Sequence, residues 1–80
     1  MITISKQGRE RLYERSKYIQ VELRGLSTDT KPVGDDQLPL PLGNCDKNLV
    51  ENGSIFIEID TGDIYMYNIE GASGEEWIKI

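Results

Sequence analysis

The chain has 80 residues, a formal net charge of −5, one cysteine and no histidine. A domain this short has a thin core and usually gains stability from disulfides, a metal or association with another chain. The single cysteine excludes an intrachain disulfide, and the lack of histidine removes the commonest metal ligand and general base. We therefore expect an oligomer or part of a larger assembly.

The charge is unevenly distributed. Residues 1–26 hold six basic and three acidic side chains, a net of +3, whereas residues 27–80 hold three basic and eleven acidic, a net of −8; together they give −5. This pattern indicates a basic segment docked on an acidic neighbour or, equally, an ordinary solvated surface. The acidic body argues against nucleic-acid binding, because it repels phosphates.

The sequence predicts no membrane partner. Its first residues lack the apolar region of a signal peptide, and no run approaches the roughly 20 apolar residues of a membrane-spanning helix. We therefore expect synthesis in the cytoplasm.

Residues 1–17 are predicted to form an N-terminal arm, either extended or helical. Residues 1–4 alternate briefly, as a short strand does. Ser5 is a suitable N-cap for a polar helix from Lys6 to Lys17, although Gly8 weakens it. The helix has few apolar residues, and Leu12 and Tyr13 carry most of its apolar stripe, so we expect the arm to lie on another surface.

Residues 18–80 are predicted to form a small β domain. The segment Tyr18–Leu26 has the alternation of a half-buried strand. Its inward side chains are predicted to be Ile19, Val21 and Leu23. Gly25, near its end, predicts a bulge or a close approach of backbone.

Residues 27–53 are predicted to form a long loop that contains all three prolines. Alternating Leu and Pro over 38–42 favour an extended, polyproline-like path. A loop this long in a compact domain is usually functional or disordered. Leu38, Leu40 and Leu42 need an apolar surface, which belongs either to this chain or to a neighbour.

The last third predicts a three-stranded antiparallel meander, with Tyr18–Leu26 as a fourth strand along one edge. Its strands are predicted at Ser54–Asp60, Ile64–Ile69 and Glu76–Ile80, with turns at 60–63 and 71–74. Gly62 is expected to supply a positive φ in the first turn. The first strand places Ile55, Ile57 and Ile59 on one face and Phe56 and Glu58 on the other. We expect Ile57 and Tyr65 to pack in the core. Trp77, in cross-strand contact with Tyr65 and Tyr67, is expected to be a core anchor, with an exposed binding hot spot as the alternative.

The sequence favours no enzymatic chemistry. Asp60-Thr61-Gly62 matches the triplet of aspartic proteases, but that chemistry needs a second copy, and the spacing fits a hairpin turn. Asp35, Asp36 and Asp46 do not have the spacing of a calcium loop. Cys45 has no basic neighbour in the sequence that would activate a thiol. We therefore expect no catalytic residue, metal or cofactor.

Three stretches carry a resemblance. Residues 24–32 are Arg-Gly-Leu-Ser-Thr-Asp-Thr-Lys-Pro, residues 53–65 are Gly-Ser-Ile-Phe-Ile-Glu-Ile-Asp-Thr-Gly-Asp-Ile-Tyr, and Trp77 lies near the end. With their flanks they cover about half the chain and resemble a family of small bacteriophage and prophage proteins. The segment 33–51 departs from that family as a longer insertion.

The resemblance implies a minor virion protein, such as a capsid decoration, head-fibre or neck component, located in the particle. It would act by contacts with capsid or other virion proteins, or with copies of itself. The alternative is a soluble phage-encoded protein that binds a host protein. The residues expected to contact a partner are Leu38, Leu40, Leu42, Arg9, Arg11 and Arg15.

Overall fold

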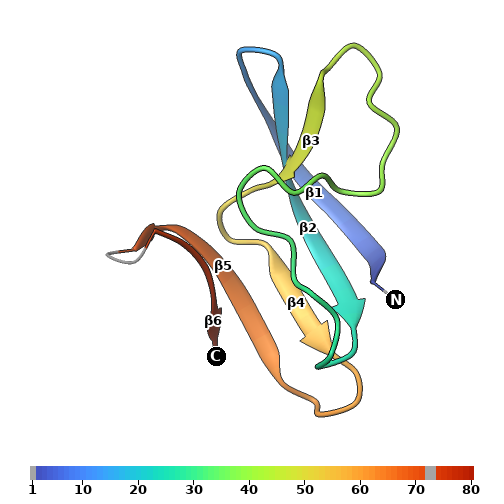
Figure 1. Ribbon diagram of the computed structural model, residues 1–80, viewed down its shortest axis with the longest axis vertical. Helices are drawn as coiled ribbons and strands as arrows, with labels where there is room; N and C mark the ends of the chain where they lie inside the picture. Colours follow the sequence, from blue (N-terminus) through green and yellow to red (C-terminus); the bar gives the residue numbers. More distant parts are fainter. Residues whose placement is uncertain (1, 72–73) are drawn as a thin grey trace.

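The computed structural model describes residues 2–71 and 74–80 (Figure 1). Within these ranges the chain is mainly β, as predicted, and forms a single six-stranded sheet without a helix. The strands are β1 (Thr3–Tyr13), β2 (Ser16–Gly25), β3 (Lys47–Val50), β4 (Ile55–Glu58), β5 (Ile64–Gly71) and β6 (Gly74–Lys79). Their order is β1-β2-β4-β5-β6, and β3 pairs with β2. The turn predicted at 71–74 includes residues 72 and 73, which lie outside the described ranges.

The helix predicted from Lys6 to Lys17 is wrong, because this segment forms β1 and the start of β2. β1 runs antiparallel to β2, from Thr3 opposite Arg24 to Tyr13 opposite Ser16. A polar segment has no apolar stripe for a helix to bury, whereas the hairpin satisfies its backbone groups directly. Two register shifts interrupt the pairing. Nearly every side chain of β1 is exposed, so its sequence lacks the apolar alternation that would have marked a strand.

β2 is the centre of the sheet, and both of its later partners run parallel to it. β3 pairs with its first half, over Ser16–Ile19, and β4 pairs with its second half, over Glu22–Gly25. The sheet is therefore mixed, not antiparallel as predicted. Parallel neighbours need a connection of a dozen or more residues, which the segment 26–46 supplies. β3 also lies inside the region predicted to be a loop over 27–53.

β3 and β4 are two pieces of one interrupted strand. Between them the chain leaves the ladder over 51–54, where Gly53 has a φ of 85°. The Ser54 hydroxyl accepts a hydrogen bond from Val21 N (3.1 Å) and donates one to Glu51 O (2.7 Å). One buried side chain thus replaces a ladder bond that the interruption removes.

β4, β5 and β6 are consecutive antiparallel neighbours. Tyr67 lies opposite Trp77, and their ring centroids are 4.9 Å apart. Trp77 also meets Phe56 edge-on at 5.9 Å, and its indole N–H donates to Pro32 O (2.9 Å). Trp77 therefore packs against the core and ties the long connection to the sheet.

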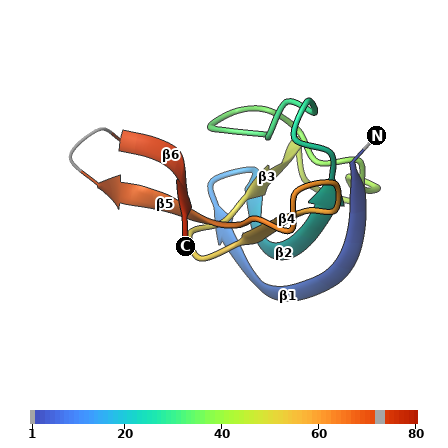
Figure 2. The ribbon, with the colours of Figure 1, turned by 90° about the horizontal axis from the view of Figure 1, so that it is seen from below.

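The core lies on the concave side of the sheet, which the connection between β2 and β3 crosses (Figure 2). The buried cluster consists of Ile19, Val21, Leu23, Leu38, Val50, Phe56 and Tyr67. The inward set predicted for β2 is thus confirmed. A Cβ on Gly25 would lie 2.9 Å from both Asp29 Oδ2 and Phe56 Cζ, which confirms the predicted close approach.

The prediction that Ile57 packs in the core is wrong. Phe56 and Glu58 are 0% and 3% exposed, while Ile55 and Ile57 lie on the opposite face of β4 and are partly exposed. The predicted alternation is correct, but the faces are exchanged. Ile59, expected to share the inward face with Ile57, is 63% exposed in the turn after β4.

Glu58 can face the core because it is fully paired there. Lys31 Nζ lies 2.7 Å from Glu58 Oε2, and the Thr61 hydroxyl donates to Glu58 Oε1 (2.8 Å). Lys31 Nζ also lies 4.7 Å from the Phe56 ring centroid and 4.5 Å from that of Tyr65. A buried carboxylate is tolerated when a cation and hydrogen bonds compensate for lost hydration.

Asn48 fastens the proline-containing connection to β3. Leu38 N donates to Asn48 O (2.8 Å), and Asn48 Nδ2 donates to Leu40 O (3.1 Å) and Pro41 O (2.9 Å). Asn48 is completely buried. The connection therefore follows a defined path across the concave face.

Candidate functional site

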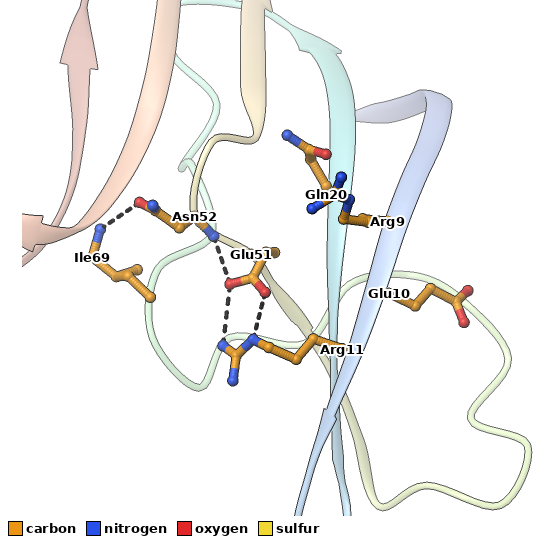
Figure 3. A pocket seen from close by; sticks show the side chains of 7 residues that line it. All are labelled: Arg9, Glu10, Arg11, Gln20, Glu51, Asn52 and Ile69. Carbon is orange, nitrogen blue, oxygen red and sulfur yellow. Dashed lines mark hydrogen bonds and ion pairs between the residues drawn. The ribbon is translucent and has the colours of Figure 1, made fainter.

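Three surfaces could carry a function: a pocket at the break between β3 and β4, the tip of the β1–β2 hairpin, and the convex face of β4–β6. The pocket has a volume of about 740 Å³ and is open to solvent. It is lined by Arg9, Glu10, Arg11, Gln20, Glu51, Asn52 and Ile69 (Figure 3). Its lining comes from β1, β2, β5 and the segment between β3 and β4.

The pocket is organised by a two-point ion pair. Arg11 Nε and Nη2 donate to the two carboxylate oxygens of Glu51, at 2.7 and 3.1 Å. Glu51 also accepts from Asn52 N (2.9 Å), and Asn52 Oδ1 accepts from Ile69 N (3.1 Å). The hydrogen bonds from Arg11 lower the pKa of the Glu51 carboxyl, despite the opposing effect of desolvation. These groups hold the break in shape.

The pocket has little electrostatic preference for a ligand. Its two arginines are balanced by Glu10 and Glu51, although Glu10 points away from the others in Figure 3. Arg9 points toward Gln20 in the same view and has no ion-pair partner among the residues that the structure describes. Nothing in the lining supplies a nucleophile next to a base.

The tip of the hairpin exposes two large apolar side chains. Leu12 and Tyr13, the last residues of β1, are 66% and 60% exposed. The turn that follows places Glu14 at a φ of 57°, a left-handed conformation that non-glycine residues seldom adopt. We define the hairpin tip as Leu12–Arg15. The sequence pattern assigned Leu12 and Tyr13 to a helix stripe and so missed their exposure.

Two of the predicted partner-contact arginines brace this tip. Arg15 Nε donates to Asp46 Oδ2 (2.9 Å) and so links the turn to the segment before β3. This hydrogen bond raises the pKa of Arg15 and lowers that of Asp46. Arg11 lies over the Tyr18 ring, 4.4 Å from its centroid. The structure thus brings Arg9, Arg11 and Arg15 onto one hairpin.

The three predicted partner-contact leucines do not form one exposed surface. Leu38 is 4% exposed and belongs to the core, and Leu40 is partly buried against it. Leu42 is 39% exposed. Leu38 covers its own chain's core, because Asn48 holds the connection against the sheet, and in this fold it is unavailable to a partner.

The convex face of β4–β6 was not singled out by the sequence. Here Ile64, Met66, Ile78 and Ile80 are each between 42% and 74% exposed. The sequence does contain this surface, as the apolar side chains on the second face of each alternating strand. It was missed because the β4 isoleucines were assigned to the core.

The structure assigns local roles to most of the acidic residues considered in the sequence. Asp60 accepts hydrogen bonds from Ser27 N (2.9 Å) and the Ser27 hydroxyl (2.6 Å), so it ties the β4–β5 turn to the end of β2. These bonds lower the pKa of Asp60. Asp46 pairs with Arg15, and Asp35 lies 3.8 Å from Lys47. Among the side chains that the structure describes, those of residues 2–69 and 76–80, no three or more acidic, cysteine or histidine groups form a cluster that could hold a metal.

Comparisons with family models, curated proteins and solved structures found no match. In the part of the chain that the structure describes, no helix is long and apolar enough to cross a membrane.

Proposed function

We propose that this protein is a minor structural component of a bacteriophage particle, such as a capsid decoration, head-fibre or neck protein. In this proposal it acts by protein–protein contact through the hairpin tip. The observation that carries the proposal is the exposure of Leu12 and Tyr13 between braced arginines. The phage context rests on the resemblance of residues 24–32 and 53–65 described above.

The composition of the tip suits an interface. Tyrosine and arginine are among the residues that contribute most to binding energy in protein complexes. Arg11 is fixed by Glu51 and Arg15 by Asp46, so the tip loses little conformational freedom on binding. In Figure 1 the tip lies at one end of the molecule, away from β5 and β6. A neighbour can therefore reach it without disturbing the core.

The charge distribution also favours contact through the β1–β2 hairpin. Residues 1–26 carry a net charge of +3 and residues 27–80 a net charge of −8. An acidic virion surface would attract the basic hairpin, although Glu51 and Asp46 offset the charges of Arg11 and Arg15, and it would repel the rest of the chain. The proposed partner is thus a virion protein with an acidic surface.

The test is mass spectrometry of purified particles from cells that produce the phage. We expect the wild-type protein in the particles, and we expect the L12S/Y13S variant to be lost from them. Its thermal unfolding should stay unchanged, because both side chains are exposed. The matched control is Ile59→Ser, which removes a similarly exposed apolar side chain (63%) in the β4–β5 turn.

Two outcomes would contradict the proposal. Absence of the wild-type protein from washed particles would favour the alternative of a soluble protein that binds a host protein. Equal incorporation of L12S/Y13S and wild type would place the contact away from the hairpin tip.

A further inference from the structure

The convex face of β4–β6 carries a continuous apolar patch. Ile55 lies opposite Met66, Ile57 opposite Ile64, and Met66 opposite Ile78. Directly opposite residues in antiparallel strands share a face, so these side chains form one surface. We define the outer patch as Ile55, Ile57, Ile64, Met66, Ile78 and Ile80. Ile80 extends it, since Ile80 N donates to Ile64 O (2.9 Å).

The side chains of the outer patch are much more exposed than those on the concave side of the same strands. Ile64, Met66 and Ile78 are 42%, 44% and 44% exposed, and Ile80 is 74% exposed. Their strand neighbour Tyr67, on the concave side, is 1% exposed. Monomeric proteins rarely expose contiguous apolar patches above a few hundred Å², and larger ones mark interaction sites.

The segment that covers this sheet lies on its concave face. The connection over 26–46 lies on the concave face (Figure 2), where Leu38 and Leu40 pack. A sheet usually buries apolar side chains against a second layer. On the convex side of β4–β6 that layer is missing among residues 2–71 and 74–80. On this face, Met66, Ile78 and Ile80 line part of a shallow cavity of about 300 Å³.

The charges beside the patch favour an identical partner. Glu22 lies next to Ile55 and Arg24 next to Ile57 in the parallel pairing of β2 with β4, so both project on the convex side. Their charges cancel, and Arg24 Nη2 is 3.9 Å from Glu22 Oε2. Two chains that each carry −5 repel one another overall, and Glu76, opposite Asn68, adds an acidic side chain on this face; the pair Glu22 and Arg24 itself adds no net charge. A two-fold axis would let Glu22 of each copy face Arg24 of the other.

The size of the molecule sets an upper limit on such an interface. The molecule measures 37 × 29 × 19 Å, so its broadest face has an area on the order of 1,000 Å², whereas the outer patch occupies only β4–β6. A standard interface buries about 800 Å² on each partner. The outer patch would form the apolar centre of such an interface, and the pair Glu22 and Arg24 part of its polar rim.

We propose that two copies of this chain associate through their outer patches, sheet against sheet, to form a symmetric dimer with a β-sandwich core. The dimer uses the convex face and leaves both hairpin tips free, so it does not depend on the proposed function. A heterologous partner on the same face would leave the isolated chain monomeric, which the first measurement below detects.

The first experiment is sedimentation equilibrium of the full chain over a range of concentrations. We expect a species of twice the 9.1 kDa chain mass. Ile78→Lys should raise the dimer dissociation constant at least about tenfold, because each copy would bring a charge to the apolar centre. The matched control, Leu12→Lys, places the same charge on an equally apolar exposed residue at the hairpin tip and should leave the constant unchanged. Met66→Gln, a milder change, should also weaken the dimer and keeps the test informative if Ile78→Lys fails to fold.

A charge exchange tests the two-fold arrangement. Arg24→Glu should weaken the dimer, because acidic side chains would then face one another across the axis. The double variant E22R/R24E should restore it, since the opposite charges would again be paired. A monomeric wild type at every concentration would overturn the proposal. So would a dimer that Leu12→Lys weakens but Ile78→Lys and Met66→Gln do not.

Discussion

Lys31 shows how one side chain decides which face of β4 is buried. Its ammonium group lies 2.7 Å from the carboxylate of Glu58, whose side chain is 4% exposed, and close to two aromatic rings. This cation compensates for the lost hydration of Glu58, so Glu58 can share the buried face of β4 with Phe56. Lys31 and Glu58 belong to the two stretches that carry the phage resemblance, so these stretches contact each other in the fold.

The first prediction concerns this pair. Lys31→Met should lower the free energy of unfolding by about 3–5 kcal/mol, because it leaves a buried carboxylate without its cation. Urea unfolding followed by Trp77 fluorescence measures the change. The control Lys47→Met removes an exposed cation 3.8 Å from Asp35 and should change stability by less than about 1 kcal/mol. Equal midpoints for both variants would show that the buried pair contributes nothing.

The second prediction concerns Gly25. A methyl group there would lie 2.9 Å from Phe56 Cζ and from Asp29 Oδ2, closer than real side chains approach. Gly25→Ala should therefore destabilise the protein by about 1–3 kcal/mol through overpacking. Gly8→Ala is the control, since its nearest neighbour is the end of the Gln20 side chain at 3.3 Å. Thermal unfolding should separate the two, and an unchanged Gly25→Ala would mean that the core adjusts freely.

At the scale of elements, the connection over 26–46 acts as the second layer of the domain. It contributes Leu38 to the core and receives hydrogen bonds from Asn48 and Trp77. β3 is short but sits next to β2, so it fixes where the connection ends. The domain therefore has a core on the concave side of its sheet only, and the connection takes the place of a second sheet there.

The third prediction compares two leucines of this connection. Leu38→Ser should destabilise the protein by about 2–5 kcal/mol, because it removes a buried side chain and adds a hydroxyl. Leu42→Ser should change stability by less than about 1 kcal/mol, since Leu42 is 39% exposed. Chemical denaturation of both variants measures this difference. If Leu38→Ser were as stable as wild type, the connection would not form part of the core.

At the scale of the whole molecule, the titrating groups make stability sensitive to acid. Hydrogen bonds from Arg11 lower the pKa of Glu51 below its ordinary 4.5, and those from Ser27 lower the pKa of Asp60 below its ordinary 3.8. The unfolded chain binds protons more readily at these sites. The stabilisation is therefore fully present above about pH 4.5 and is lost as the pH falls through the folded-state values.

The fourth prediction follows from this linkage. The melting temperature should vary little between about pH 7 and about pH 5.5, because the chain has no histidine to titrate there. It should fall between about pH 4.5 and about pH 2.5. In E51Q/D60N the fall over this acidic range should be smaller than in wild type. An equally steep fall in that variant would assign the acid sensitivity to other carboxylates.

Local patterns in the sequence identified the features that depend on neighbouring residues. Alternation in β2 identified Ile19, Val21 and Leu23 as core residues, and Gly25 was correctly placed at a close approach, which is made by side chains and not by a second backbone. Gly62 has the positive φ that its turn requires (80°). These predictions succeeded because side-chain alternation and the conformational freedom of glycine act over a few residues.

The features that depend on distant partners became visible only in the folded chain. β1 is exposed along almost its whole length and is a strand through its pairing with β2, and Lys31, far from β4 in the chain, neutralises Glu58 on the buried face. Phe56 and Glu58 therefore face inward, and the isoleucines of β4 face outward in the outer patch. Strand pairing and the neutralisation of a buried charge are made by residues that meet only in the folded chain, so no local pattern could reveal them.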